Sequence, residues 1–226
     1  MNKVLSIVIP VFNKINFTNS CLKDLIQLPD DHEIIVIDNG STDETKEELS
    51  KITDPKVTVI TNKENVFHSK ACNQGYVAAT ADVVLFMNND IRVKSNHSNW
   101  TKNIIEACKD YILVGPTMGL LDKQLNFVKE ASEQLEGYSY IGGWCIAANK
   151  ETWKKASIKI DQIWNEHYPM YFNDADLSFR ARRGGLTLKV ISLPDVVHFG
   201  KVSAIQLNIN KLYNEGRKVF LQDWGK

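Results

Sequence analysis

The amino-acid sequence predicts an α/β protein with a mostly parallel central sheet flanked by helices. Short apolar runs alternate with amphipathic segments from residue 3 to residue 87. The runs are continuously apolar, which is typical of strands buried on both faces of a sheet. A polar segment rich in Asn and Asp follows each run. Alternation of this kind favours parallel strands joined by helical crossovers.

The first element is a strand over residues 3–11. This run is β-branched, carries Pro10 and lacks the small-residue cleavage site of a signal peptide. Residues 16–28 follow as a helix, because their apolar side chains recur at helical intervals. Further strands are expected over residues 33–37, 56–60 and 82–87, with helices over 43–52 and 69–80 between them.

The alternation stops after Asp90, which predicts a mixed second half. We expect strands over 111–114, 141–148 and 186–191, a hairpin around 120–128, a mobile loop over 130–140, and helices over 97–109, 150–156, 173–185 and 205–224. No repeat or linker interrupts the chain, so residues 1–226 are expected to form one domain. Its parts would be a regularly alternating half (1–90), a mixed half (91–204) and a C-terminal helix (205–226).

Composition narrows the function classes. The 226 residues are 43% hydrophobic and carry 27 basic and 27 acidic side chains. A net charge of zero gives no general attraction to nucleic acid, so no such partner is expected. The apolar stretches fall short of the roughly 18 residues of a spanning helix, which predicts no transmembrane segment. Four scattered cysteines without a Cys-x-x-Cys pair favour a reduced cytoplasmic location, with any membrane contact peripheral.

The polar segments after the four predicted strands are expected to form one site. They cover residues 10–13, 38–43, 61–65 and 88–90. Ligands of open α/β sheets bind outside the carboxyl ends of the strands, where these segments would meet. The sequence lacks the glycine-rich motifs of nicotinamide-dependent dehydrogenases and of P-loop enzymes.

Six strings taken in chain order carry a family resemblance: SIVIPVFNK, IIVIDNGSTDET, NKENVFHSKACNQG, VVLFMNND, YFNDADLSFRARRGG and VVHFGKVS. Together they resemble family 2 of the glycosyltransferases, with the Rossmann-like GT-A fold. The resemblance implies that residues 1–90 form the nucleotide-sugar-binding half and residues 91–204 the acceptor and catalytic half. The resemblance implies inverting transfer of a sugar from a nucleotide-diphosphate donor to an acceptor hydroxyl, assisted by Mn²⁺ or Mg²⁺. The acceptor would be a glycan or glycoconjugate, as in polysaccharide biosynthesis.

The resemblance implies donor-binding roles for the strand ends. Asp38 matches the family aspartate that accepts a hydrogen bond from the nucleobase. A carboxylate can read the imide N–H of uracil or thymine, or an amino group of guanine. A UDP-sugar is therefore favoured, with dTDP- and GDP-sugars as alternatives. Lys70 lies where the family places a donor-facing group, and a solvated lysine is the other interpretation. The donor set is Pro10, Val11, Phe12, Asn13, Asp38, Asn39, Asn65, Lys70, Asn88 and Asn89.

Asp90 and His198 are the expected metal ligands. Asn88-Asn89-Asp90 stands where similar enzymes carry Asp-x-Asp, and Mn²⁺ or Mg²⁺ prefers oxygen ligands. Only Asp90 of this motif is anionic, so the metal would be held weakly, through water, or mainly by the donor phosphates. His198 resembles the family histidine that completes the site. A plain strand-ending turn is the alternative for the motif, because Asn and Asp favour turns.

Asp174 is the expected general base. It matches the acidic motif of the family just before a helix, where the usual Glu-Asp becomes Asn173-Asp174. A helix start should keep this carboxylate ionised. Asp176, four residues before Arg180, is expected to pair with that arginine and is placed on the acceptor side. Trp144 is expected either to stack on an acceptor sugar or to pack in the core.

The remaining histidines, at positions 32, 68, 97 and 167, show no ligand spacing and are expected on the surface. Two functions stay open at this point. One is an active glycosyltransferase. The other is a sugar-nucleotide- or carbohydrate-binding protein that kept the fold and lost turnover, because the acidic motifs are reduced to Asn-Asn-Asp and Asn-Asp.

Overall fold

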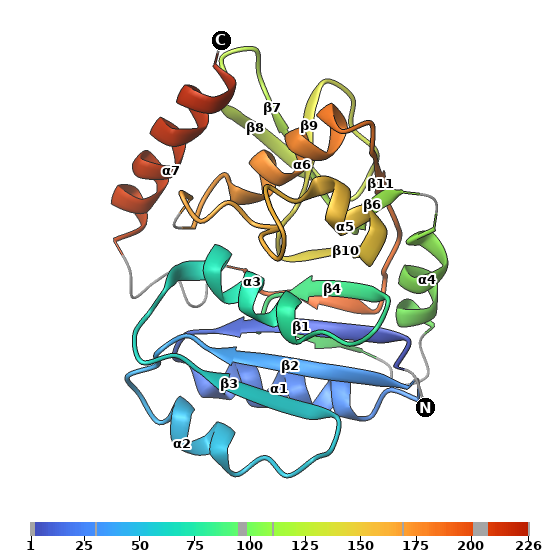
Figure 1. Ribbon diagram of the computed structural model, residues 1–226, viewed down its shortest axis with the longest axis vertical. Helices are drawn as coiled ribbons and strands as arrows, with labels where there is room; N and C mark the ends of the chain where they lie inside the picture. Colours follow the sequence, from blue (N-terminus) through green and yellow to red (C-terminus); the bar gives the residue numbers. More distant parts are fainter. Residues whose placement is uncertain are drawn as a thin grey trace.

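The main sheet has seven strands in the order β11-β6-β10-β4-β1-β2-β3 (Figure 1). The computed structural model describes residues 3–29, 31–94, 99–109, 111–168, 170–200 and 208–225. Within the sheet, β10 runs antiparallel to both of its neighbours and the other pairs are parallel. The predicted fold class is therefore confirmed. The strands are β1 Leu5–Val11, β2 His32–Asp38, β3 Val57–Thr61, β4 Val83–Met87, β6 Ile112–Gly115, β10 Cys145–Asn149 and β11 Thr187–Val190.

Helices cover both faces of this sheet. The described helices are α1 Ile15–Ile26, α2 Thr45–Ser50, α3 Phe67–Ala78, α4 Trp100–Ala107, α5 Lys150–Ala156, α6 Asn173–Arg183 and α7 Ile209–Trp224. Figure 1 shows α1 and α3 on opposite faces of β1–β3. Positions 97, 98 and 205–207, where two predicted helices were expected to begin, lie outside the described residues.

The alternation of side chains along the strands divides the core into two layers. In β1, Ile7 and Ile9 pack with α1 and α4 on one face, whereas Val8 packs with α3 on the other. Successive strand residues point to opposite faces, so both layers draw on the same strands. All of these side chains are fully buried. This explains why the strands read as continuous apolar runs.

Two smaller sheets complete the second half. The three-stranded antiparallel sheet has the order β8-β7-β9, with β7 Met118–Leu121, β8 Phe127–Ala131 and β9 Tyr138–Ile141. The hairpin expected around 120–128 is confirmed. The mobile loop expected over 130–140 is wrong at its ends, since β8 runs to Ala131 and β9 begins at Tyr138. Apolar periodicity misses β9 because one of its inward side chains is Ser139, whose hydroxyl donates to Leu135 O at 2.7 Å.

The shortest sheet pairs β5 (Ile91–Val93) antiparallel with β12 (Val196–His198). Neither strand was predicted, because three residues carry no periodic signal. The single strand expected over 141–148 is also divided, with β9 ending at Ile141 and a turn over 142–144 before β10. The β5–β12 pairing sets His198 opposite Ile91, the residue that follows Asp90. Two segments more than a hundred positions apart in the chain thus meet at one point.

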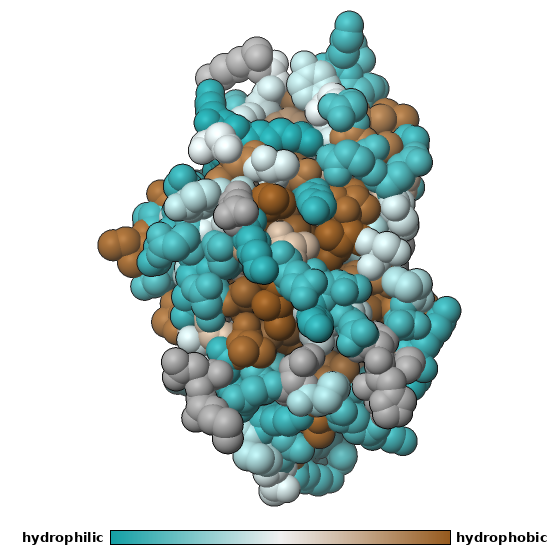
Figure 2. All heavy atoms as spheres, turned by 90° about the vertical axis from the view of Figure 1, so that its right-hand side faces the viewer, coloured by the Kyte–Doolittle hydropathy of each residue, from teal (hydrophilic) through white to brown (hydrophobic). Residues whose placement is uncertain are grey.

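Figure 2 shows hydrophilic side chains over much of the right-hand face of Figure 1, with hydrophobic ones along its middle. None of the helices in the described part of the chain is both long and apolar enough to cross a membrane. The four cysteines are buried free thiols. Trp153 and Trp164 are fully buried.

A buried ion pair at the centre of α6 should contribute strongly to stability. Arg180 Nε donates to Asp176 Oδ2 at 2.8 Å, and the Asp176 side chain is only 3% exposed. Asp176 Oδ1 also accepts from Trp224 Nε1 at 3.1 Å, which ties α6 to α7. Removing one member of a buried pair leaves the other charge uncompensated.

We expect Asp176→Asn to lower the free energy of unfolding by about 3 kcal/mol. Urea denaturation measures this change. The exposed pair of Glu48 and Lys51 provides the matched control, and Glu48→Gln should cost less than about 1 kcal/mol. Equal losses in the two variants would contradict a special role for the Asp176–Arg180 pair.

Candidate active site

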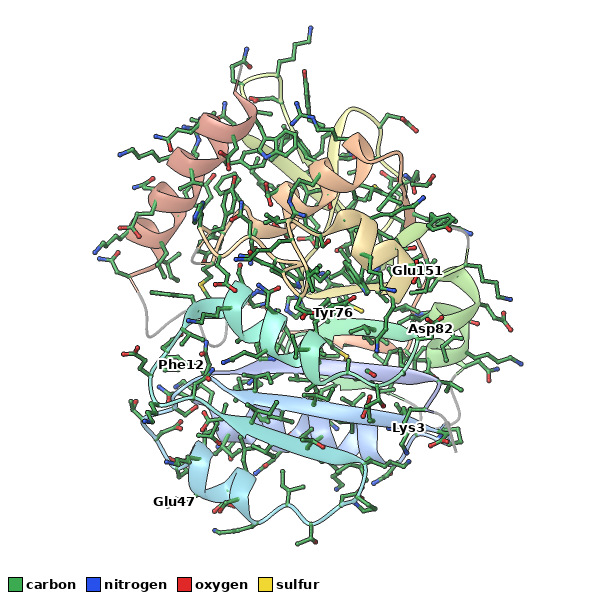
Figure 3. All side chains as sticks on the ribbon, in the orientation of Figure 1. Lys3, Phe12, Glu47, Tyr76, Asp82 and Glu151 are labelled. Atoms are coloured by element: carbon green, nitrogen blue, oxygen red, sulfur yellow. The ribbon has the colours of Figure 1, made fainter. Side chains whose placement is uncertain are left out.

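A pocket of about 330 Å³ opens at the carboxyl ends of β1, β2 and β4. Figure 3 shows Phe12 at this end of β1, with Lys3 at the opposite end of the strand. Among the residues predicted from sequence, those that line it are Pro10, Val11, Phe12, Asn39, Asn65, Asn88, Asn89, Asp90, Trp144, Asp174 and His198. Lining residues that sequence reasoning did not place there are Phe67, His68, Glu130, Tyr140, Gly142, Gly143, Met170, Tyr171 and Asn173.

Four predicted site residues are not part of the pocket lining. Lys70 is exposed on α3, as its alternative interpretation held. Asn13 is buried and its Oδ1 accepts from Thr42 N at 2.8 Å, so it braces the 38–43 turn. Asp38 is fully buried, with Oδ1 accepting from Ser41 N at 3.0 Å. Asp176 is held by Arg180 and Trp224, which confirms the predicted pairing with Arg180 and leaves its carboxylate outside the pocket.

A hydrogen bond between the side chains of Asn39 and Asn65 helps to shape the pocket. Asn39 Nδ2 donates to Asn65 Oδ1 at 2.9 Å, and Asn39 Oδ1 accepts from Val66 N at 3.0 Å. Asn65 Oδ1 also accepts from Phe67 N at 2.8 Å, where the backbone is left-handed with a φ of 64°. A Cβ at Gly40 would come within 2.4 Å of the Glu64 backbone. These contacts fix the loop that presents Phe67 to the cavity.

Asp90 and His198 form a close pair in the pocket lining. Asp90 Oδ1 lies 3.2 Å from His198 Nε2, and their side chains are 5% and 22% exposed. Asn88 Nδ2 lies 3.3 Å from the same ring nitrogen. Asp90 Oδ1 is buried and forms no hydrogen bond with acceptable geometry among the described residues. A buried carboxylate oxygen without a donor is costly unless a ligand completes its coordination.

The chemistry of this pair fits a divalent cation in part. A carboxylate and an imidazole suit Mn²⁺, and Mg²⁺ accepts the carboxylate with further oxygens. Within the described ranges, no group of three His, Cys, Asp or Glu side chains could hold an ion by itself. Neither Lys nor Arg is among the described residues that line the pocket. A cation held here would therefore need oxygens from a bound ligand to complete its coordination.

Trp144 holds His198 in place. The two rings stack with centroids 4.6 Å apart and planes 10° apart. Trp144 Nε1 donates to Thr117 Oγ1 at 2.9 Å and to Glu130 Oε1 at 3.2 Å. The indole also packs against the core layer of α1 and α4, in agreement with the core-packing interpretation. The imidazole of His198 lies flat on one face of the indole, and this stacking fixes its orientation.

Asp174 lines the same pocket from the start of α6. Its Oδ2 accepts from Gly143 N at 3.0 Å, and its Oδ1 accepts from Ala175 N at 2.9 Å. Burial raises the pKa of Asp174 to about 6, against the lowering effect of these backbone donors, and Glu130 adds to the rise. Desolvation outweighs the backbone donors and makes this carboxylate less acidic than an exposed one, although a pKa of about 6 still leaves it mostly ionised at neutral pH.

Close packing between the 142–144 turn and α6 fixes the position of the Asp174 carboxylate. A Cβ at Gly143 would lie 3.0 Å from Asp174 Cβ. On the other side, Phe172 takes a left-handed backbone with a φ of 66° before the helix begins. Strained backbone of this kind persists where surrounding structure enforces it, and it is frequent at functional sites.

His32 is fully buried and His68 lines the pocket, so the expectation that both lie on the surface was wrong. The His68 ring packs edge-on against Trp164 with centroids 5.3 Å apart and lies 3.1 Å from Asn173 Nδ2. Burial lowers the pKa of His68 to about 4, which keeps the ring neutral. Helical spacing was the available signal, since His68 stands four residues before the buried Cys72.

Residues 6–123 match glycosyl transferase family 2, which is just over half of the chain. The chain belongs to glycosyl transferase family 2. This family 2 member carries Asp174 and His198 beyond the matched residues, so their roles depend on the geometry above. An uncharacterized glycosyltransferase of Rickettsia conorii is 33% identical over 87 residues, 38% of this chain and 14% of the relative. Glycosyltransferase GlyG of Streptococcus pneumoniae is 27% identical over 99 residues, 42% and 33% of the two chains. Each match therefore covers a third or less of the relative.

Solved structures share the fold of this family 2 chain. A mannosyltransferase from Pyrobaculum calidifontis, in complex with GDP-Man and Mn²⁺, has a TM-score of 0.62 at 14% identity and covers 86% of this chain and 56% of its own. GalNAc-T7, solved with UDP, GalNAc and Mn²⁺, has a TM-score of 0.68 at 16% identity and covers 86% and 43%. S. aureus TarS gives 0.62 at 18% identity over 90% and 38%. The fold is thus of the GT-A type.

Proposed function

We propose that the protein is an inverting glycosyltransferase that moves a sugar from a nucleotide-diphosphate donor to a hydroxyl of a glycan acceptor. The observation that carries the proposal is one pocket lined by the Asp174 carboxylate and by the Asp90–His198 pair. Sugar transfer needs a base beside the acceptor hydroxyl and positive charge beside the leaving diphosphate. Family membership supplies independent support for this reaction class.

The nucleotide-binding side of the pocket is proposed to be formed by β1, β2 and α3. Phe12 and Phe67 give it apolar surface. Asp38 Oδ2 is buried and has no hydrogen-bond partner among the residues described. A nucleobase N–H could satisfy this oxygen after a shift of the 38–43 turn that covers it. We propose a UDP-sugar as donor, with dTDP- and GDP-sugars as the alternatives to be tested beside it.

Asp90 and His198 are proposed to hold a divalent cation, Mn²⁺ or Mg²⁺, together with the donor phosphates. The cation would neutralise charge on the departing diphosphate. The absence of Lys and Arg from the described pocket lining supports this proposal, because no side chain there offers a permanent positive charge for a diphosphate. Two structural neighbours were solved with Mn²⁺. Trp144 keeps the imidazole oriented toward Asp90.

Asp174 is proposed to accept the proton of the attacking hydroxyl. Gly143 N and Ala175 N occupy one lone pair on each carboxylate oxygen and fix its plane. The neutral His68 ring and the amide of Asn173 line the pocket without competing as bases at neutral pH. Glu130, another carboxylate of the lining, accepts from Thr117 and Trp144 through Oε1. Asp174 is favoured over Glu130 because its pKa of about 6 lies close to the working pH that suits a general base.

A single displacement should invert the anomeric configuration of the transferred sugar. A base on one side of the sugar and a leaving diphosphate on the other suit in-line attack by the acceptor hydroxyl. We expect the product to carry the configuration opposite to that of the donor, and proton NMR of the isolated product measures it. A retained configuration would mean that a protein nucleophile takes part and that the role of Asp174 is different.

The proposal is tested by a donor screen followed by a transfer assay. Thermal shift with UDP-, dTDP- and GDP-sugars in the presence of Mn²⁺ should select one donor class, because a ligand of the native state raises its stability. The selected donor is then incubated with and without glycan acceptors. Sugar transfer to an acceptor would support the proposed enzyme activity. If the donor binds but is neither transferred nor hydrolysed, the alternative of a binding protein that kept the fold is favoured.

A further inference from the structure

A second cavity, of about 450 Å³, lies next to the active-site pocket. Glu130, Trp144 and His198 line both cavities. These three side chains form a shared wall that is fixed by hydrogen bonds and by ring stacking. An elongated ligand with one end near Asp174 could therefore pass along this wall into the second cavity.

The lining of the second cavity combines hydroxyl groups with apolar surface. Thr117, Ser132 and Ser192 supply the hydroxyls, and Leu193 and Val197 are among the apolar side chains. Sugar rings present hydroxyls at their edges and C–H groups on their faces, so such a lining can satisfy both. Thr117 Oγ1 already donates to Glu130 Oε1 and accepts from the indole N–H. Ser132 and Ser192 are exposed and can bond to a ligand.

The charges of the second cavity disfavour anionic ligands. Its described lining contains neither Lys nor Arg, and its carboxylate is Glu130. His198 is the remaining titratable side chain, and it lies beside Asp90. A phosphate, a uronic acid or a nucleotide would meet a negative charge there without a fixed positive partner. The lining thus fits uncharged sugars.

We propose that the second cavity binds the neutral sugar units that precede the accepting residue of an oligosaccharide acceptor. This inference rests on the proposed function, because it takes the accepting hydroxyl to lie beside Asp174. It narrows the acceptor to a neutral chain of at least two sugar units. The shared wall would then contact both ligands. Trp144 stacks on His198, which faces the donor, and it also lines the second cavity, where the acceptor would bind.

The experiment begins with a printed array of neutral mono- to tetrasaccharides and of matched chains that contain uronic acids. The protein is applied with UDP and Mn²⁺. The neutral series with the strongest signal is then titrated calorimetrically. Ser192→Trp and Ser132→Trp place a bulky ring in the second cavity from two exposed positions. Ser50→Trp, at the exposed end of α2, is the matched control.

We expect the affinity of the wild type to rise about tenfold from the monosaccharide to the disaccharide or trisaccharide. Each cavity variant should lose this gain while keeping its affinity for the monosaccharide and for UDP with Mn²⁺. Ser50→Trp should behave as the wild type. Affinity that does not grow with chain length, preference for the acidic chains, absence of any neutral signal, or cavity variants equal to the control would each overturn the inference.

Failure of the proposed function gives a different result. It would appear as a wild-type protein that binds none of the nucleoside diphosphates tested with Mn²⁺. If nucleotide binding and transfer are intact and the cavity variants have no effect on longer acceptors, only the acceptor inference is wrong. The nucleotide titrations of the same variants therefore separate the two.

Discussion

Asp174→Asn should lower the rate of sugar transfer by about 10²–10⁴-fold, the usual cost of losing a general base. The amide preserves the shape of the side chain and removes its basicity. Its oxygen can still accept from Gly143 N or Ala175 N, which position the carboxylate in the wild type. Donor affinity should therefore stay close to that of the wild type. Single-turnover measurements at saturating donor and acceptor isolate the chemical step.

The pH dependence follows from the pKa of Asp174. Burial raises this pKa to about 6, so the ionised base is lost as the pH falls through that value. We expect the transfer rate of the wild type to rise with an apparent pKa of about 6 and then level off. Asp174→Asn should lack this limb. The other groups that face Asp174 are Glu130 and Tyr140, and Glu130→Gln should shift the limb to lower pH because Glu130 contributes to raising the pKa.

The same pKa shift predicts the effect on folding. A carboxyl group whose pKa is raised in the folded state stabilises the fold most when protonated, below its unfolded pKa of about 4. That contribution is lost as the pH rises through about 6. At neutral pH the ionised Asp174 is therefore a cost to stability, and Asp174→Asn should unfold at the same temperature as the wild type or a higher one. A lower melting temperature would indicate that lost activity reflects lost structure.

Asp176→Asn provides the matched control, because it removes a carboxylate two residues away on the same helix. Its partners are Arg180 and Trp224, outside the pocket. It should lower stability far more than it lowers the chemical step. If instead Asp176→Asn loses transfer and Asp174→Asn remains nearly normal, the two roles within this motif must be exchanged.

Sequence reasoning worked best where a periodic pattern had structural consequences. The alternation of apolar runs with amphipathic segments predicted β1 to β4 and their helices to within about two residues at most ends, since most side chains of β1, β2 and β4 are apolar and buried. It also placed the strand ends together. Asn39, Asn65 and Asp90 line the same pocket because parallel strands present their carboxyl ends at one edge.

The parts of the site that were not predicted come from contacts between distant segments. Glu130 and Tyr140 reach the pocket from β8 and β9, an antiparallel sheet whose weak apolar pattern gave no register. The stacking of Trp144 on His198 depends on β5 and β12, two strands too short to show a pattern. Lys70 was drawn into the donor set by its position after Asn65, but a helix turns successive side chains by about 100°, and Lys70 faces solvent.

In the proposed mechanism, the reduced acidic motif would concentrate the metal-dependent chemistry on Asp90. Asn88 and Asn89 are neutral, and Asn89 Nδ2 donates to Thr18 Oγ1 at 2.9 Å, which commits its side chain to α1. Asp90 is the anionic member, it is buried, and its Oδ1 has no hydrogen bond within the part of the chain that the structure describes. The imidazole of His198 lies 3.2 Å from this oxygen. A substitution in the Asp90–His198 pair should therefore reduce stabilisation of the leaving diphosphate without changing proton transfer to Asp174.

Asp90→Ala should weaken the Mn²⁺-dependent part of donor binding by about 100-fold and remove most turnover, because one carboxylate carries the ionic share of the protein's ligands. Calorimetric titration of the donor with and without Mn²⁺ measures the effect directly and does not depend on activity. Asn88→Ala, which loses only a contact of 3.3 Å to the imidazole, should weaken binding less than Asp90→Ala. The melting temperature without ligand should not fall far in Asp90→Ala, because the buried Oδ1 that is removed accepts no hydrogen bond from any described residue. If donor affinity in Asp90→Ala is equal to that of the wild type and equally dependent on Mn²⁺, Asp90 does not hold the metal, and the cation must be bound elsewhere or by the donor alone.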